Sequence, residues 1–263
     1  MTVLRRARPA LGTVVELGIR TSPGPRPAPG PCWQEAALAA GWAALAEVER
    51  ALSAFLPQSD LGRFNAAPAG AGLAVRSTTA AVLRLSRALW RESGGLLDVS
   101  LGTGPEAWSL EEFGGAALLC KHTADVRLDL GGVAKGHAVD RALEVMAEAA
   151  AEAAQPPACW VNAGGDLRTC GVALRVHLRD ERSGGARPWI ELREGAVATS
   201  DFHPRARARL VGDARRASHV SVISSRCCLS DALTKVVALS GREDHPLVLA
   251  HSARAFIHDR HLR

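Results

Sequence analysis

The sequence predicts an α+β fold, with a largely antiparallel sheet and flanking helices. Alanine-rich segments with apolar residues at helical spacing are mixed with short apolar runs, and these patterns indicate helices and strands respectively. The two kinds of segment do not alternate strictly, which disfavours a parallel βαβ sheet. At 263 residues the chain is long enough to bury a sizeable core, and this length fits one large domain or two small ones.

The first half of the chain is divided by glycine and proline. A strand that is entered through the glycine at position 12 is predicted, and a hairpin loop over the Pro/Gly-rich residues 22–31. Two amphipathic patterns predict helices, the second of which is stopped by paired glycines. In order, we expect a strand at Leu11–Ile19, a helix at Trp33–Leu56, a loop with a short turn at Phe55–Asn65, a helix at Thr78–Ser93, a short extended piece at Leu96–Leu101 and irregular chain at Gly102–Gly115.

The second half contains more and shorter elements. Alanine favours helix over 138–154, and Gly241 marks the end of a later helix. Short apolar runs between turn residues predict strands. In order, we expect a helix at Ala138–Ala154, strands at Ala158–Asn162, Leu174–Leu178, Trp189–Leu192, Ala196–Ser200 and Val220–Ser224, a helix at Ser230–Ser240 and a hairpin of Leu247–Leu249 with Ala255–His258.

Composition bears on three questions: whether the chain spans a membrane, where in the cell it is found, and what its charge can bind. No apolar run reaches the ~18 residues that suggest a membrane span. Residues 1–10 have no signal-peptide pattern, so we expect a cytoplasmic protein with reduced cysteines. The net charge of +5 includes an arginine cluster between Arg205 and Arg216. Such a cluster can be a solvated loop, a phosphate-binding site or a nucleic-acid surface, and we expect no nucleic-acid partner.

The stretch from Asp129 to Gly136, Asp-Leu-Gly-Gly-Val-Ala-Lys-Gly, carries the strongest sign of a binding site. Paired glycines allow a ligand to approach the backbone closely. The helix that follows directs unpaired N–H groups at the turn, which suits a phosphate. Lys135 adds positive charge and Asp129 adds an acceptor. On this stretch alone, a plain strand-to-helix turn with a solvated lysine explains the pattern better than a binding site does.

Seven stretches in this order resemble the ApbE family of FAD:protein FMN transferases. The resemblance runs from about Pro9 to Gly241, and the Asp129–Gly136 match is its most specific part. The stretches are Leu11–Thr13, Phe55 with Ser59 and Asn65, Gly95–Asp98, Asp129–Gly136, Asn162–Asp166, Ala198–Ser200 and Ser230–Lys235.

The resemblance implies a single flavin-nucleotide-binding domain over residues 1–263, an activity and a set of site residues. Such an enzyme binds FAD and Mg²⁺, transfers FMN to a threonine hydroxyl of a partner protein and releases AMP. Phe55 replaces a stacking tyrosine and keeps its ring face. The implied FAD-contacting positions are Leu11, Phe55, Leu96, Leu97, Asp98, Asp129, Lys135 and Val211. The implied metal ligands are Ala134, through its carbonyl, Asp231 and Thr234, and the implied catalytic residues are His203 and Asp231.

Two departures from the family pattern bear on this chemistry. Lys235 stands where the family helix has a metal-binding threonine, and a charged ammonium does not ligate Mg²⁺. We therefore expect an ion pair between Lys235 and Asp231 in place of the metal. The family's His-x-x-Asp-Pro segment is absent, and His203 stands in that interval. The alternative is a degenerate member that binds FAD or a flavoprotein partner without transferring FMN.

We also expect the paired glycines to lie close to the acidic start of the Ser230–Ser240 helix. The proposal of a nucleotide diphosphate site depends on that proximity, because both segments must reach the same phosphates.

Overall fold

A computed structural model of the chain describes residues 2–21, 33–152, 158–179, 185–202, 216–217 and 219–258. Its largest element is a seven-stranded sheet in the order β1-β2-β6-β7-β10-β11-β12, and every neighbouring pair is antiparallel. The predicted α+β class with a largely antiparallel sheet is therefore confirmed. The strands are β1 (Thr2–Ala10), β2 (Thr13–Thr21), β6 (Cys159–Ala163), β7 (Asp166–Cys170), β10 (Gly195–Asp201), β11 (His219–Ser224) and β12 (Arg254–Ile257).

Two tight hairpins of this sheet meet at their tips. β1 and β2 are joined by Leu11 and Gly12, with φ of 52° and 71°, and β6 and β7 by Gly164 and Gly165, with φ of 62° and 107°. Two-residue hairpin loops with both φ values positive match the twist of the strands. A Cβ on Gly164 would lie 2.2 Å from Oγ1 of Thr13, so only glycine fits where the tips touch.

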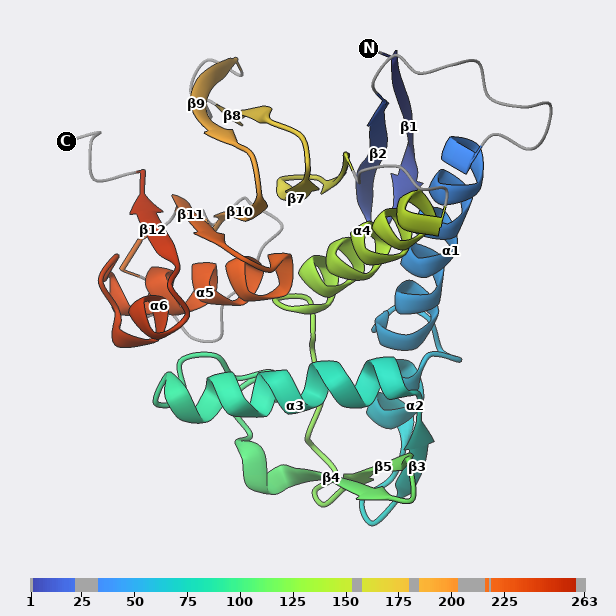
Figure 1. Ribbon diagram of the computed structural model, residues 1–263. Helices are drawn as coiled ribbons and strands as arrows, with labels where there is room; N and C mark the ends of the chain where they lie inside the picture. The colour runs from blue at the N-terminus through green and yellow to red at the C-terminus, as the bar shows by residue number, and fades with distance from the viewer. Residues whose placement is uncertain are drawn as a thin grey trace.

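Three long helices accompany the large sheet: α1 (Trp33–Leu52), α4 (Ala134–Glu152) and α5 (Cys227–Ser240). Helix α4 packs on β6 and β7, α5 packs on β10 and β11, and α1 packs against α4. In Figure 1 these helices form a middle layer, with the large sheet above them. A Cβ on Gly41 would lie 2.6 Å from Leu17 and 2.9 Å from Met146, so a glycine allows α1 to approach both β2 and α4.

A smaller unit lies on the other side of the helical layer (Figure 1). It contains a three-stranded antiparallel sheet in the order β3-β5-β4 and two helices. The buried carboxylate of Asp60 joins these helices, because it accepts hydrogen bonds from Arg76 N at 2.8 Å and Thr79 Oγ1 at 2.7 Å. The elements are α2 (Asp60–Ala66), β3 (Gly72–Val75), α3 (Ser77–Glu92), the 3-10 turn η1 (Pro105–Ala107), β4 (Trp108–Phe113) and β5 (Ala116–Lys121).

The remaining elements lie at the β12 end of the sheet. The hairpin β8 (Leu174–Arg179) and β9 (Ala186–Leu192) contacts the sheet through Trp189, whose ring centroid lies 5.1 Å from that of Phe256. The short helix α6 (Pro246–Ala250) precedes β12. None of the described helices combines the length and apolar character that crossing a bilayer requires.

Several predictions about individual elements were wrong. The segment Phe55–Asn65 contains helix α2, residues 102–115 contain strand β4, 96–101 forms turns, and Leu247–Leu249 is helical. The N-terminal strand β1 was missed because its arginines hide the strand pattern. Strands β3, β5 and β7 were also missed. The predicted hairpin loop at 22–31 lies outside the described residues.

Candidate functional site

The segment that leads into the glycine turn is held by side-chain and backbone contacts from the smaller unit. Asn65, on α2, donates to Leu128 O at 3.0 Å and accepts from Leu128 N at 2.8 Å. Asp129 N donates to Val99 O at 2.8 Å. These contacts bring three of the predicted stretches together: the one with Asn65, the one that ends at Asp98, and the glycine turn itself.

The glycine turn has little room for side chains. The Asp129 carboxylate accepts a hydrogen bond from Gly131 N at 2.8 Å, which closes the turn locally. Asp129 remains exposed. A Cβ on Gly132 would lie 3.0 Å from Cε of Lys235, so Lys235 of α5 packs directly on the turn. Helix α4 begins at Ala134, four residues earlier than predicted.

The first turns of α4 and α5 touch each other. A Cβ on Gly136 would lie 2.4 Å from Cys227 O, so the glycine is required for this approach. Gly136 N also donates to Asp231 Oδ2 at 3.3 Å. The expected proximity of the two segments is confirmed, with one correction: α5 begins at Cys227. Asp231 therefore lies in the second turn of the helix rather than at its start.

Four charged side chains meet at this junction, and we call them the charged tetrad: Lys135, Asp166, Asp231 and Lys235. Lys135 Nζ lies 2.7 Å from Asp166 Oδ2, and Lys235 forms an ion pair with Asp231. Both carboxylates are buried, while the side chains of Lys135 and Lys235 are 30% and 12% exposed. The predicted ion pair of Lys235 with Asp231 is thus confirmed.

The pKa values of the two carboxylates in the tetrad are shifted in opposite directions. Burial, reinforced by the charge of Asp231, raises the pKa of Asp166 to about 6. Burial also raises the pKa of Asp231, but the ammonium groups of Lys235 and Lys135 outweigh it and hold that pKa below its usual range. Apart from the ion pair with Lys135, no hydrogen bond from another described residue reaches either Asp166 oxygen.

The arrangement around Asp231 does not fit a divalent cation. The Lys235 ammonium contacts Oδ1 of Asp231 and donates to its backbone carbonyl at 2.9 Å. The Thr234 hydroxyl donates to the same carbonyl at 2.7 Å and lies 2.9 Å from Ser200 Oγ. The described residues also contain no group of three or more His, Cys, Asp or Glu side chains suited to a metal. An ammonium thus occupies the position beside Asp231 that a cation would need.

The other predicted FAD-contacting residues lie in varied settings. Leu11 is at the tip of the β1–β2 hairpin, where its N–H donates to Glu49 at 3.2 Å, and it borders an open hollow of 610 Å³. The Phe55 ring is 95% exposed, whereas Leu97 is buried. The Asp98 carboxylate accepts from Ser100 N at 2.8 Å and Gly102 N at 2.9 Å. The predicted FAD contact Val211 lies outside the described residues, as does the predicted catalytic residue His203.

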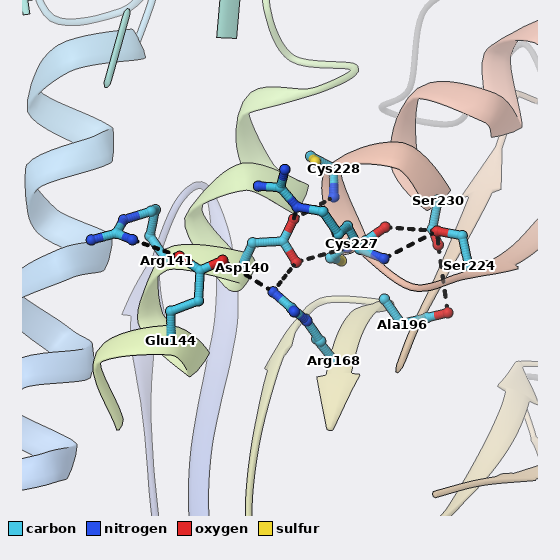
Figure 2. A network of polar contacts seen from close by, with 10 residues as sticks. Asp140, Arg141, Glu144, Arg168, Ala196, Ser224, Cys227, Cys228 and Ser230 are labelled. Atoms are coloured by element: carbon cyan, nitrogen blue, oxygen red, sulfur yellow. Dashed lines mark hydrogen bonds and ion pairs between the residues drawn. The ribbon is translucent and has the colours of Figure 1, made fainter. Parts of the chain in front are cut away.

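A buried network beside the tetrad was not predicted from the sequence. Asp140 of α4 accepts hydrogen bonds from Cys227 N at 2.8 Å and Cys228 N at 3.0 Å, and pairs with Arg168 at 2.9 Å. Figure 2 shows this carboxylate between the start of α5 and the guanidinium from β7. It satisfies N–H groups that a helix start leaves unpaired. The position of Asp140, one helical turn after Gly136 on the same face, was the available signal.

Comparisons with known proteins agree on one family. The family model described as "ApbE family" matches residues 11–257. Two solved structures share the fold. Flavin transferase ApbE from Vibrio cholerae has a TM-score of 0.75 and 21% identity, with coverage of 97% of this chain and 92% of that one. The ApbE protein from Thermotoga maritima has a TM-score of 0.78 and 20% identity, with coverage of 97% and 94%.

A curated relative is also similar in sequence. It is the "FAD:protein FMN transferase" of Rhodobacter capsulatus, 31% identical over 235 residues, with 73% of this chain covered. The match spans 44% of the length of that relative.

Proposed function

This chain belongs to the ApbE family, and from that membership we propose that it is an FAD:protein FMN transferase. In the proposed reaction, a threonine hydroxyl of a partner protein attacks the phosphorus of the FMN half of FAD. A new phosphoester bond forms, the bond to the bridging pyrophosphate oxygen breaks, and AMP leaves. The hydroxyl proton passes to a base, for which His203 remains the predicted residue.

The observation that carries the proposal is the charged tetrad at the glycine turn. Phosphoryl transfer requires mainly positioning and neutralisation of negative charge. Lys135 and Lys235 bring two ammonium groups to the glycine turn at the start of α4, where the dipole of that helix also favours anions. We propose that the diphosphate of FAD binds there, with Lys135 drawn from Asp166 toward the phosphates.

The flavin and adenine ends are proposed to reach outward from this point. Phe55 offers an exposed aromatic face on which a ring can stack. Leu11, Leu96, Leu97, Asp98, Asp129 and Val211 remain predicted FAD contacts. We propose that the two units described above act together as a single flavin-nucleotide-binding domain over the whole chain.

The proposed reaction assigns no step to magnesium. The ligand set Ala134, Asp231 and Thr234 remains a prediction from the family pattern. In the structure, Asp231 forms an ion pair with Lys235, and the Thr234 hydroxyl is hydrogen-bonded to that of Ser200. We therefore propose that Lys135 and Lys235 neutralise the charge of the phosphates.

The test combines FAD with a threonine-containing acceptor protein in the presence of either Mg²⁺ or a chelator. Transfer gives a flavin-fluorescent acceptor band on a denaturing gel together with an equimolar amount of AMP. An unlabelled acceptor and no AMP, under conditions where FAD binds, would exclude transferase activity toward that acceptor.

The ion pair of Lys235 with Asp231 favours a second candidate, a protein that binds FAD or a flavoprotein partner without transfer. In that case, added protein shifts FAD fluorescence, while AMP is absent with every acceptor tried. If FAD fluorescence is also unchanged, both candidates fail.

A further inference from the structure

Two cysteine side chains face each other across the β6–β7 hairpin. Cys159 and Cys170 are the last register pair of this antiparallel ladder, directly opposite each other. Both are free thiols, and their side chains are joined by a hydrogen bond. The sequence spacing gives no hint of the pair, because ten residues that fold back on themselves separate the two cysteines.

The backbone holds this pair close to the separation that a disulfide needs. Directly opposite residues of an antiparallel pair have Cβ atoms about 4.5–5.5 Å apart. A disulfide needs Cβ atoms about 3.5–4.5 Å apart, and the contact between the thiols shows that the side chains point toward one another. Oxidation therefore requires rotation of two side chains and a small adjustment of the ladder, without any rearrangement of the fold.

The two thiols have different exposure and acidity. Cys170 is half-buried and Cys159 is buried. The hydrogen bond from Cys159 lowers the pKa of Cys170 to about 7, while the same bond and burial raise the pKa of Cys159. Thiolate is the reactive form of cysteine, so Cys170 is the nucleophile of the pair at neutral pH.

The other described cysteines lack these properties. Burial raises the pKa of Cys120, which is half-buried and has no cysteine opposite it. Burial also raises the pKa of Cys227 and Cys228 at the start of α5. The latter two are adjacent in sequence, and their backbone N–H groups are held by Asp140.

We propose that Cys159 and Cys170 form a reversible thiol-oxidation site that closes to a disulfide by exchange with a small-molecule disulfide. The Cys170 thiolate attacks one sulfur of that molecule, forms a mixed disulfide and releases the first small thiolate. Cys159 then loses its proton and attacks the Cys170 sulfur, forming the internal disulfide and releasing the second small thiolate. The protein loses two electrons and two protons, and the small disulfide is reduced to two thiols.

The bond would fix the open end of a hairpin in the middle of the sheet. Strand β6 pairs with β2 and β7 pairs with β10, so the disulfide ties the N-terminal three strands covalently to the C-terminal four. Asp166 of the charged tetrad is the first residue of β7, at the opposite end of the same strand. This proposal is independent of the flavin chemistry.

The experiment uses the full-length protein and oxidised glutathione as the probe. After incubation and acid quenching, intact mass and peptide mapping identify the products. Wild type is expected to lose two hydrogens and to give a linked Cys159–Cys170 peptide, with full reversal by dithiothreitol. Cys159→Ser is expected to stop at one bound glutathione on Cys170. Cys170→Ser is expected to lose the linkage, and Cys120→Ser, the matched control, is expected to behave as wild type.

Two further measurements keep the proposal falsifiable if a variant folds poorly. In wild type, the rate at which iodoacetamide labels Cys170 should rise as pH passes through about 7, while Cys120 should need higher pH. The disulfide form should melt about 5 °C higher than the reduced form. The proposal is overturned if wild type accumulates only the mixed disulfide, if the linked peptide contains other cysteines, or if Cys170 is labelled no faster than Cys120 at pH 7.

Discussion

Lysine is rare in this protein, and its positions are informative. Of 32 basic residues only three are lysines, Lys121, Lys135 and Lys235. All three contact groups in the interior: Lys121 is 2% exposed and donates to the carbonyls of Phe64 and Asn65 at 3.5 and 3.4 Å. An ammonium is a compact point charge, whereas guanidinium is a broad planar fork. At all three positions the compact ammonium lies beside carbonyl or carboxylate oxygens of the interior.

The first prediction concerns Lys235. Replacing it with threonine frees Oδ1 of Asp231 and offers a hydroxyl one helical turn away, so a divalent cation can bind. We expect Lys235→Thr to bind Mg²⁺ in the presence of FAD and wild type to bind none, as measured by calorimetry. Lys121→Met, which removes a lysine far from Asp231 in sequence and contacts, is the control. Equally tight Mg²⁺ binding by wild type would show that the ammonium does not occupy the cation position.

The second prediction concerns pH and Asp166. Its pKa is about 6 in the folded protein against 3.8 for the free side chain, so the folded state retains the proton where the unfolded state has released it. The stability that Asp166 contributes is therefore full below about pH 4 and is lost as pH rises through about 6. That difference is on the order of 3 kcal/mol.

Denaturant unfolding between pH 4 and 7 measures this effect. Asp166→Asn should gain stability relative to wild type across that range, because asparagine has no proton to lose. A constant difference between the two proteins over the same range would mean that burial does not perturb this carboxyl.

The third prediction separates binding from stability at Phe55. Because the ring is 95% exposed, Phe55→Ala should change the free energy of unfolding by less than about 0.5 kcal/mol. Loss of a stacked aromatic ring should weaken FAD binding by roughly tenfold. Phe113→Ala, another exposed phenylalanine at 67%, serves as control and should leave FAD affinity unchanged. Fluorescence titration gives the affinities, and equal affinity in Phe55→Ala and wild type would remove Phe55 from the site.

Residue identity in the sequence predicted part of the site. The glycine turn and Lys135 were found because their residue types stand out along the chain, whereas Asp231 and its pair with Lys235 followed from the resemblance to the ApbE family. Asp166 appeared in a matched stretch without a role, and Asp140 was missed. Their importance comes from burial against partners distant in sequence, such as Cys227, which no local pattern reports.

At the scale of elements, one carboxylate holds two helices together. Asp140 of α4 caps the N-terminus of α5 and pairs with Arg168, whose side chain is 20% exposed. We expect Asp140→Ala to cost about 3 kcal/mol in urea unfolding, since it leaves the start of α5 without its acceptor and removes the nearer carboxylate from a largely buried guanidinium. Glu144→Ala removes a more exposed partner of the same arginine and should cost less than about 1 kcal/mol. Similar losses in both variants would refute the capping role.

Helices were predicted better than short strands. The apolar periodicity of α1, α3, α4 and α5 extends over several turns and identified each one, with ends displaced by a few residues. Strands β3, β4 and β5 are four to six residues long, too short for alternation to be distinguished from loop. Helix α2 is seven residues long and depends on the buried Asp60 and on Asn65, whose partners are elsewhere in the chain.

At the scale of the whole molecule, the proposed nucleotide site depends on both units. The smaller unit contributes Asn65 and Val99, which hold Leu128 and Asp129. The helices of the large unit contribute the charged tetrad. A ligand on the glycine turn would therefore contact residues whose positions are fixed by both units, so its binding energy should stabilise the entire fold.

This gives the last prediction. A ligand that binds only the folded state adds about 2.7 kcal/mol at a concentration of 100 Kd, which for a protein of this size raises Tm by roughly 5–10 °C. We expect FAD to produce such a shift in one cooperative transition, because both units are held at the same turn. Riboflavin, which lacks the diphosphate, is the matched control ligand and should shift Tm little. An equal shift with riboflavin would place the flavin ring, and not the phosphates at the glycine turn, at the centre of recognition.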